Sequence, residues 1–134
     1  MIRIIKFMIN FVFKYLIMKF SQLPEEEKYH FFINHLKEQK EVWLLNAMEG
    51  MYAMIEDMTG QEYVPLWIDK DDAVMHIRNE WSNYEICSMK LNELLSWLNE
   101  LEKDGIKIAI SGENDNKIIP VQPMELINHL MSDS

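Results

Sequence analysis

The sequence has little cysteine, glycine and proline, and these absences exclude several protein classes. Its 134 residues include 1 Cys, 4 Gly and 4 Pro. The lone thiol, Cys87, excludes an internal disulfide and a zinc site built on several thiolates. So few glycines and prolines, beside 49% hydrophobic residues, exclude collagen-like and wholly disordered chains. The length fits one domain that buries a core without covalent or metal cross-links.

The chain also lacks a Gly-rich phosphate loop, a nucleophile motif and a local cluster of metal ligands. Its four histidines are scattered, and His30 and His35 do not share a helix face because they are five residues apart. The acidic run 69–72 lacks the later acid and glycine of a calcium loop, so helix capping explains it. Cys87 lies in an alternating apolar stretch, which favours an inert buried thiol. The sequence therefore predicts no catalytic residue, no metal and no cofactor.

Negative charge dominates the body of the chain. The net charge is −9, but residues 1–20 contain four basic residues and no acid, so residues 21–134 carry −13. This acidity disfavours contact with the phosphate backbone of nucleic acids. It suits a solvated surface, or attraction to a basic partner protein.

The first 20 residues differ from the rest, and we expect them to be an extension of a single domain at 21–134. Taken as a helix, they place most of their polar residues on one stripe among apolar neighbours. Their charges interrupt a membrane span, and they lack a secretory cleavage site. Three interpretations stay open: a misplaced start codon with Met8 or Met18 as the true start, a basic helix on an acidic membrane surface, or docking on a protein. We expect a chain that begins at Met18 to melt like the full chain.

After residue 20, short apolar strands alternate with amphipathic helices. Asp69 and Asn92 are placed to cap the second and third helices, and Gly105 to end the third in a left-handed conformation. Trp97 lies on the apolar stripe of that third helix, which predicts a core position. Pro65 lies within an apolar strand and indicates a sheet edge or a bulge. We expect strands at 42–47, 51–55, 63–68, 87–91, 106–110 and 117–121, and helices at 21–40, 69–81, 92–104 and from 123 onward.

This order of elements predicts the fold class. Strands and helices of this length are typical of one α+β domain. We expect a mixed, mostly antiparallel sheet of about five or six short strands, with about three to four helices packed on it.

Aromatic residues supply the candidate binding site. Trp43, Trp67 and Trp81 fall at a strand, a strand end and a helix end. One interpretation makes them core residues whose indole N–H groups have partners. The other makes them the rim of a groove for a peptide or small ligand, with Glu49 and Tyr84 as polar contacts. Both interpretations stay open.

Short motifs follow one another along most of the chain in a specific order and spacing. They are Val42-Trp43-x-Leu45 followed by Glu49-Gly50, Pro65-Leu66-Trp67 with Ala73, Trp81-x-x-Tyr84, and Leu94-Leu95-x-Trp97-Leu98-x-x-Leu101-x-x-Asp104-Gly105-Ile106. Through these motifs, residues 23–131 resemble the bacterial domain-of-unknown-function family 2750. The resemblance implies a small bacterial α+β protein, and it implies no catalytic residues.

These observations favour a non-enzymatic, cytoplasmic protein-interaction module of an immunity or adaptor type, with a basic protein as its partner. The alternative is a small ligand-binding domain or enzyme that uses the tryptophan-lined groove. We expect no nucleic-acid partner, and contact with a membrane surface only through residues 1–20. The sequence leaves the oligomeric state open.

Overall fold

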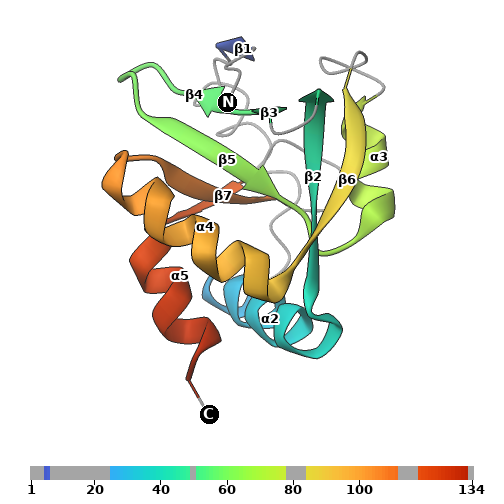
Figure 1. Cartoon of the computed structure of the whole chain (residues 1–134), viewed down its shortest axis with the longest axis vertical. Coiled ribbons are helices and arrows are strands. Elements are labelled where there is room, and N and C mark those ends of the chain that lie inside the picture. The colour runs from blue at the N-terminus through green and yellow to red at the C-terminus, as the bar shows by residue number, and fades with distance from the viewer. Residues whose placement is uncertain (1–4, 7–24, 49–50, 78–83, 112–117, 133–134) are drawn as a thin grey trace.

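Two β-sheets and four helices are present in the part of the chain that the structure describes (Figure 1). This computed structural model describes residues 5–6, 25–48, 51–77, 84–111 and 118–132. The predicted α+β class is confirmed. In chain order the elements are β1 (Ile5–Lys6), α2 (Glu25–Gln39), β2 (Glu41–Met48), β3 (Met51–Tyr52), β4 (Ile55–Glu56), β5 (Glu62–Leu66), α3 (Lys70–Ile77), β6 (Glu85–Lys90), α4 (Leu91–Lys103), β7 (Lys107–Ser111), β8 (Ile118–Val121) and α5 (Pro123–Leu130).

The strands form a five-stranded sheet in the order β1-β4-β5-β7-β8 and a three-stranded sheet in the order β3-β2-β6. Parallel pairing joins β1 to β4 and β5 to β7, and the other four pairs are antiparallel, which confirms a mixed, mostly antiparallel arrangement. The strand expected at 51–55 is divided. Its first part, β3, pairs with β2, whereas β4 leaves that sheet and pairs with β5.

Two tryptophans join the sheets through their backbones. The N–H of Trp43 donates to the carbonyl oxygen of Trp67 at 2.7 Å, and the N–H of Trp67 donates back at 3.0 Å. Trp43 lies in β2, and Trp67 directly follows β5. The bridge therefore connects the central strand of the small sheet to the end of a strand in the large one.

Pro65 lies where β5 changes its neighbour. β5 is not an edge strand, because β4 and β7 flank it in the sheet. However, β4 pairs with β5 only as far as Tyr63. On the same side of the chain, the next pairing is between Trp67 and Trp43 of β2. Since alternate residues point their backbone groups to the same side, the N–H that Pro65 lacks would face the stretch between these pairs. The proline thus occupies a local gap in the ladder inside the sheet.

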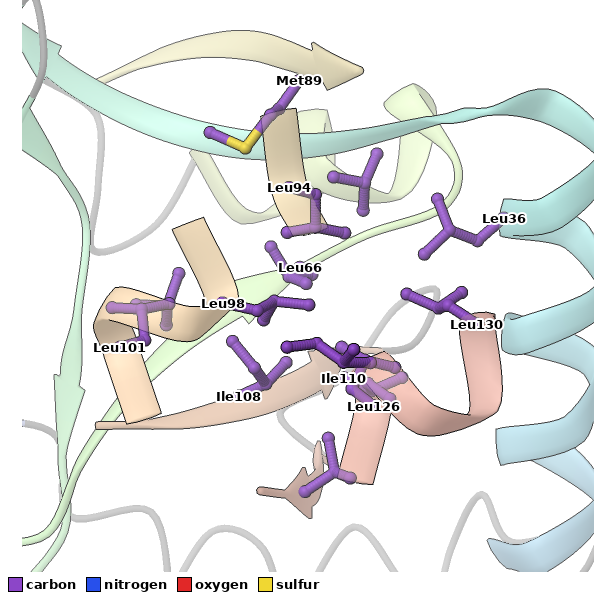
Figure 2. Packing of buried hydrophobic residues seen from close by; sticks show 14 of the residues in the cluster. Leu36, Leu66, Met89, Leu94, Leu98, Leu101, Ile108, Ile110, Leu126 and Leu130 are labelled. Carbon is purple, nitrogen blue, oxygen red and sulfur yellow. The ribbon is translucent and has the colours of Figure 1, made fainter. Parts of the chain in front are cut away.

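Three helices cover one face of the five-stranded sheet and build the main core. Figure 2 shows Leu98 of α4 pointing toward Leu66 of β5 and Ile108 of β7. Leu126 of α5 and Leu36 of α2 complete this layer, and all five side chains are fully buried. Each such side chain stabilises the fold by about 1.5–3 kcal/mol relative to an exposed one.

A second, smaller apolar cluster lies on the other face of the strands. Along β2, Val42 and Leu44 belong to the main core, whereas Trp43 and Leu45 belong to the second cluster or pack against it. This alternation is the pattern of a strand that is buried on both faces. α3 covers the second cluster through Ala73, which is fully buried.

Two helix ends confirm the sequence signals. Asp69 caps α3, because its Oδ1 accepts the backbone N–H of Asp71 at 2.9 Å. Gly105 follows α4 with φ 73°, a left-handed conformation that favours glycine. The N–H of Ile106 then donates to the carbonyl oxygen of Leu101 at 3.0 Å, so α4 ends in a Schellman motif.

Two predictions for α4 are wrong in detail. The helix begins at Leu91 rather than after Asn92, because β6 runs into it without a connecting loop and the Glu93 carboxylate accepts the backbone N–H of Lys90 at 3.4 Å. Trp97 is half-buried rather than enclosed in the core. Its ring packs at the margin of the main core, against a tyrosine of β3.

Within residues 1–20 the structure describes only β1, which pairs with β4 at the edge of the five-stranded sheet. The other residues of this segment lie outside the described part. The division into an extension and a single domain therefore stays a prediction, as does the melting behaviour of a chain that begins at Met18. No helix among the described residues is long and apolar enough to cross a membrane.

Candidate functional site

Three of the five residues predicted for a groove lie together in the structure. Trp67 is 1% exposed and Tyr84 is 8% exposed, and both belong to the second apolar cluster. Trp43 is half-buried and packs against the same cluster. Glu49 and Trp81 lie outside the described residues. Two of the predicted residues are thus core side chains, and the groove itself stays a prediction.

The surroundings of this aromatic group are those of a structural cluster. Lys70, the first residue of α3, has its Nζ 5.5 Å from the ring centroid of Trp43, within the range of a cation–π contact. Burial raises the pKa of Tyr84, so its hydroxyl stays protonated at neutral pH. The ammonium group holds the start of α3 against β2, and Tyr84 packs in the second apolar cluster as a neutral side chain.

A different group of side chains lies on the opposite face of the three-stranded sheet. Asn46 of β2 pairs with Tyr52 of β3 on one side and with Glu85 of β6 on the other. Directly paired residues point to the same face, so these three side chains form one row across the sheet. Cys87 lies on the same face, two residues further along β6.

α4 borders this row with an aromatic ring and a carboxylate. The rings of Trp97 and Tyr52 have centroids 5.0 Å apart at an interplanar angle of 48°, and both side chains are half-buried. Glu93 lies one helical turn before Trp97 and is exposed, as is Glu85. We call Tyr52, Glu85, Cys87, Glu93 and Trp97 the acidic aromatic face.

Burial raises the pKa values of two side chains on this face, Tyr52 and Cys87. It raises the pKa of Tyr52, and the nearby Cys87 and Glu93 raise it further. Burial also raises the pKa of the Cys87 thiol, which therefore stays protonated and is a poor nucleophile at neutral pH. Asn46 Oδ1 is buried and accepts no hydrogen bond from the described part of the chain. The face is suited to binding through apolar area, hydrogen bonds and negative charge.

A separate set of polar contacts fastens the last helix to α2. The Tyr29 hydroxyl lies 2.6 Å from His129 Nδ1, and burial together with the charge of Glu125 raises the pKa of Tyr29 to about 12. Lys37 Nζ donates to the carbonyl oxygen of Ser132 at 2.7 Å. In the residues that the structure describes, no group of three or more His, Cys, Asp or Glu side chains is arranged to hold a metal ion.

The acidic aromatic face is not among the sites that the sequence predicts. The apolar stripe of α4 predicts a core position for Trp97, and Tyr52 belongs to a strand whose partner the sequence does not indicate. One signal was present in the sequence. Trp97 lies at the margin of the stripe formed by Leu94, Leu98 and Leu101, and Glu93 precedes it by one turn on the same margin.

The fold and this surface together define a class of protein. It is a small α+β domain whose three-stranded sheet carries an acidic, partly aromatic face. A profile of the family described as "Protein of unknown function (DUF2750)" matches residues 29–130. The chain belongs to this family, and the resemblance carried by its motifs is thereby confirmed. No curated protein and no solved structure matches the chain.

Proposed function

We propose that this chain is a non-enzymatic protein-interaction module of the cytoplasm, an adaptor or immunity-type protein, which binds a basic partner protein through its acidic aromatic face. The observation that carries the proposal is the half-buried pair of Tyr52 and Trp97 beside two exposed carboxylates, Glu85 and Glu93. Protein interfaces are enriched in tyrosine and tryptophan, with polar groups at the rim.

Charge supports a basic partner. The chain carries a net charge of −9, which accelerates encounter with a positive surface and repels an acidic one. Glu93 places one of these charges near Tyr52. Glu85 places another in the same row as Tyr52, on the other side of Asn46. A lysine or arginine of the partner would contact the carboxylates while its aliphatic part packs on the rings.

The test compares three tagged forms of the full chain, each used to capture cross-linked proteins from the native cells. The first is the wild-type chain, and the second combines Glu85→Lys with Glu93→Gln. Glutamine keeps an oxygen that accepts the Lys90 N–H at the start of α4. The third combines Glu26→Lys with Glu27→Gln, which gives the same charge change at exposed residues of α2.

We expect a protein that both the wild-type chain and the α2 variant capture and that the variant of the acidic aromatic face does not capture. Titration calorimetry with that purified protein then measures the loss of affinity. Equal capture by all three chains, or equal loss in both variants, contradicts the proposed surface. Capture of nothing by the wild-type chain contradicts the proposed function.

A further inference from the structure

β6 is one of the two edge strands of the three-stranded sheet, and half of its backbone N–H and C=O groups point away from β2. The N–H of Leu91 donates to the carbonyl oxygen of Lys40 at 2.9 Å, directly after the last pair of the β2–β6 ladder. Backbone groups alternate in direction along a strand, so the N–H and C=O of Cys87 and Met89 also face β2. Those of Ile86 and Ser88 then face the opposite edge, whereas the N–H of Lys90 on that side already donates to the Glu93 carboxylate at 3.4 Å.

The backbone bridge between Trp43 and Trp67 shows independently which residues of β6 point their backbone groups away from β2. Trp43 lies opposite Ser88 in the ladder, yet its N–H and C=O bond to Trp67. Trp43 and Ser88 therefore form a non-hydrogen-bonded pair within the ladder, and the backbone groups of Ser88 point outward.

Within the described residues, β6 is regular along its whole length, and α3 packs on its Trp43 face. β6 pairs only with β2 among the described residues, and its register runs through six consecutive pairs without a bulge. The opposite edge strand, β3, has two residues and follows an irregularity in the register of β2. Natural edges are commonly shortened, bulged, or interrupted by proline or inward charge. β6 has charged residues only at its two ends, Glu85 and Lys90.

We infer that the outward edge of β6 takes an extended segment of the partner as an added strand, in which basic and apolar side chains alternate. This inference rests on the proposed function and specifies how the partner binds. An added strand satisfies the outward N–H and C=O groups, and its alternate side chains lie on the two faces of the sheet. One set then lies beside Glu85 and Cys87, on the acidic aromatic face. The other set lies beside Ile86 and Ser88, on the face of Trp43.

Charge selects a partner strand over a second copy of this chain. Two copies would each bring a net charge of −9. If two copies paired their β6 strands antiparallel about a two-fold axis, residues directly opposite each other would point to the same face of the sheet. Glu85 and Lys90 point to opposite faces, so Glu85 would never lie opposite Lys90 of the other copy. A basic strand, by contrast, finds carboxylates on one face and apolar side chains on the other.

The probe for this edge is an acetylated and amidated octapeptide of alternating lysine and valine, and its control alternates glutamate and valine. Amide hydrogen exchange of the full chain is measured by nuclear magnetic resonance with and without each peptide. With the lysine peptide at ten times its dissociation constant, exchange at the Ile86 and Ser88 amides should slow about tenfold, because these amides exchange only in chains that have no peptide bound. The Cys87 and Met89 amides, which already bond to β2, should change less, and the glutamate peptide should protect none.

A matched pair of substitutions tests the backbone contact. Ser88→Pro removes the outward N–H but leaves the inward ladder bonds of Cys87 and Met89, since proline is tolerated in an edge strand where its nitrogen faces solvent. Ser88→Ala removes the hydroxyl and keeps the N–H. We expect Ser88→Pro to weaken binding of the lysine peptide about tenfold and Ser88→Ala to leave it unchanged. Protection of the Cys87 and Met89 amides in each variant reports that the sheet is intact.

The outcomes separate the two proposals. Unchanged exchange at Ile86 and Ser88 in the wild-type chain overturns strand addition without reference to any variant. Equal binding of the peptide by Ser88→Pro and the wild-type chain overturns it as well. If the partner captured from cells still depends on Glu85 and Glu93 in either case, the proposed function stands and only the mode of binding fails.

Discussion

Replacing Asp57 by asparagine should destabilise the chain by about 1–2 kcal/mol, because its carboxylate organises the connection between β4 and β5. Oδ1 accepts the backbone N–H of Thr59 at 2.8 Å, the Thr59 hydroxyl at 2.6 Å and the N–H of Gln61 at 3.1 Å. Oδ2 accepts the Tyr63 hydroxyl at 2.9 Å. Water replaces part of what is lost at this surface loop, so the cost stays well below the sum of four charged hydrogen bonds.

The effect of this substitution should depend on pH. Burial acts to raise the pKa of Asp57, but the hydrogen bonds from Thr59, Tyr63 and Gln61 outweigh it and lower the pKa below its ordinary value of 3.8. A carboxyl group with a lowered pKa in the folded state stabilises that state fully above the unfolded value. The stabilisation is lost as the pH falls through the folded value. The difference between the two chains should therefore be constant from pH 5 to 7 and should shrink below about pH 4.

Urea denaturation at pH 7 and at pH 3 measures this difference, and Asp104→Asn is the matched control. Asp104 is exposed at the end of α4, where its backbone N–H but not its carboxylate takes part in the described hydrogen bonds. We expect the control to change the free energy of unfolding by less than about 0.5 kcal/mol at either pH. A loss for Asp57→Asn that is equal at pH 3 and pH 7, or no loss at pH 7, would refute the reasoning.

Three further predictions concern the core, a helix end and the thiol. Leu98→Ala should cost about 2–5 kcal/mol in urea denaturation because the side chain is fully buried, and a loss below about 0.5 kcal/mol would contradict its core position. Gly105→Ala should cost about 1–2 kcal/mol in the same assay. The φ of Gly105 is 73°, and an added Cβ would meet no atom within 4 Å, so the expected cost is backbone strain alone. An unchanged free energy of unfolding would contradict this strain. Cys87 should react with a thiol reagent at pH 7 more slowly in the native chain than in urea, since burial raises its pKa; equal rates would contradict the stated burial.

Local signals in the sequence were sufficient for most helices and strands. The third predicted helix has a clear apolar period, and Gly105 ends α4 as expected because only a residue that tolerates positive φ suits that position. Asp69 likewise begins α3 through a hydrogen bond within its own turn. Such features depend on residues a few positions apart, and the sequence displays them directly.

Features that depend on distant segments could not be predicted in the same way. The pattern at 51–55 is continuous in sequence, but its two halves pair with different strands. The proline in β5 was expected to mark an edge or a bulge, whereas the gap at Pro65 arises from a change of partner between β4 and β2. Strand partners are chosen by long-range packing, which a single sequence does not display.

The candidate site was predictable only in part. Trp43 and Trp67 do lie together, because their backbones pair where the two sheets meet. Tyr52 and Trp97 form the more accessible aromatic pair, but they come from β3 and α4, and their contact depends on how that helix crosses the small sheet. Residue type alone identified aromatic side chains as important without indicating which of them would reach the surface.

The most direct test of the account is the nuclear magnetic resonance spectrum of the full chain as it is titrated with the partner captured from cells. We expect the largest shifts at the Trp97 indole N–H and at the amides of Tyr52, Ser88 and Glu93. Amides of α2 and α5, which lie at the lower end of the molecule as drawn, should move little (Figure 1). Shifts concentrated on α2 and α5, with the Trp97 indole and the β6 amides unchanged, would contradict the claim that the small sheet is the binding surface.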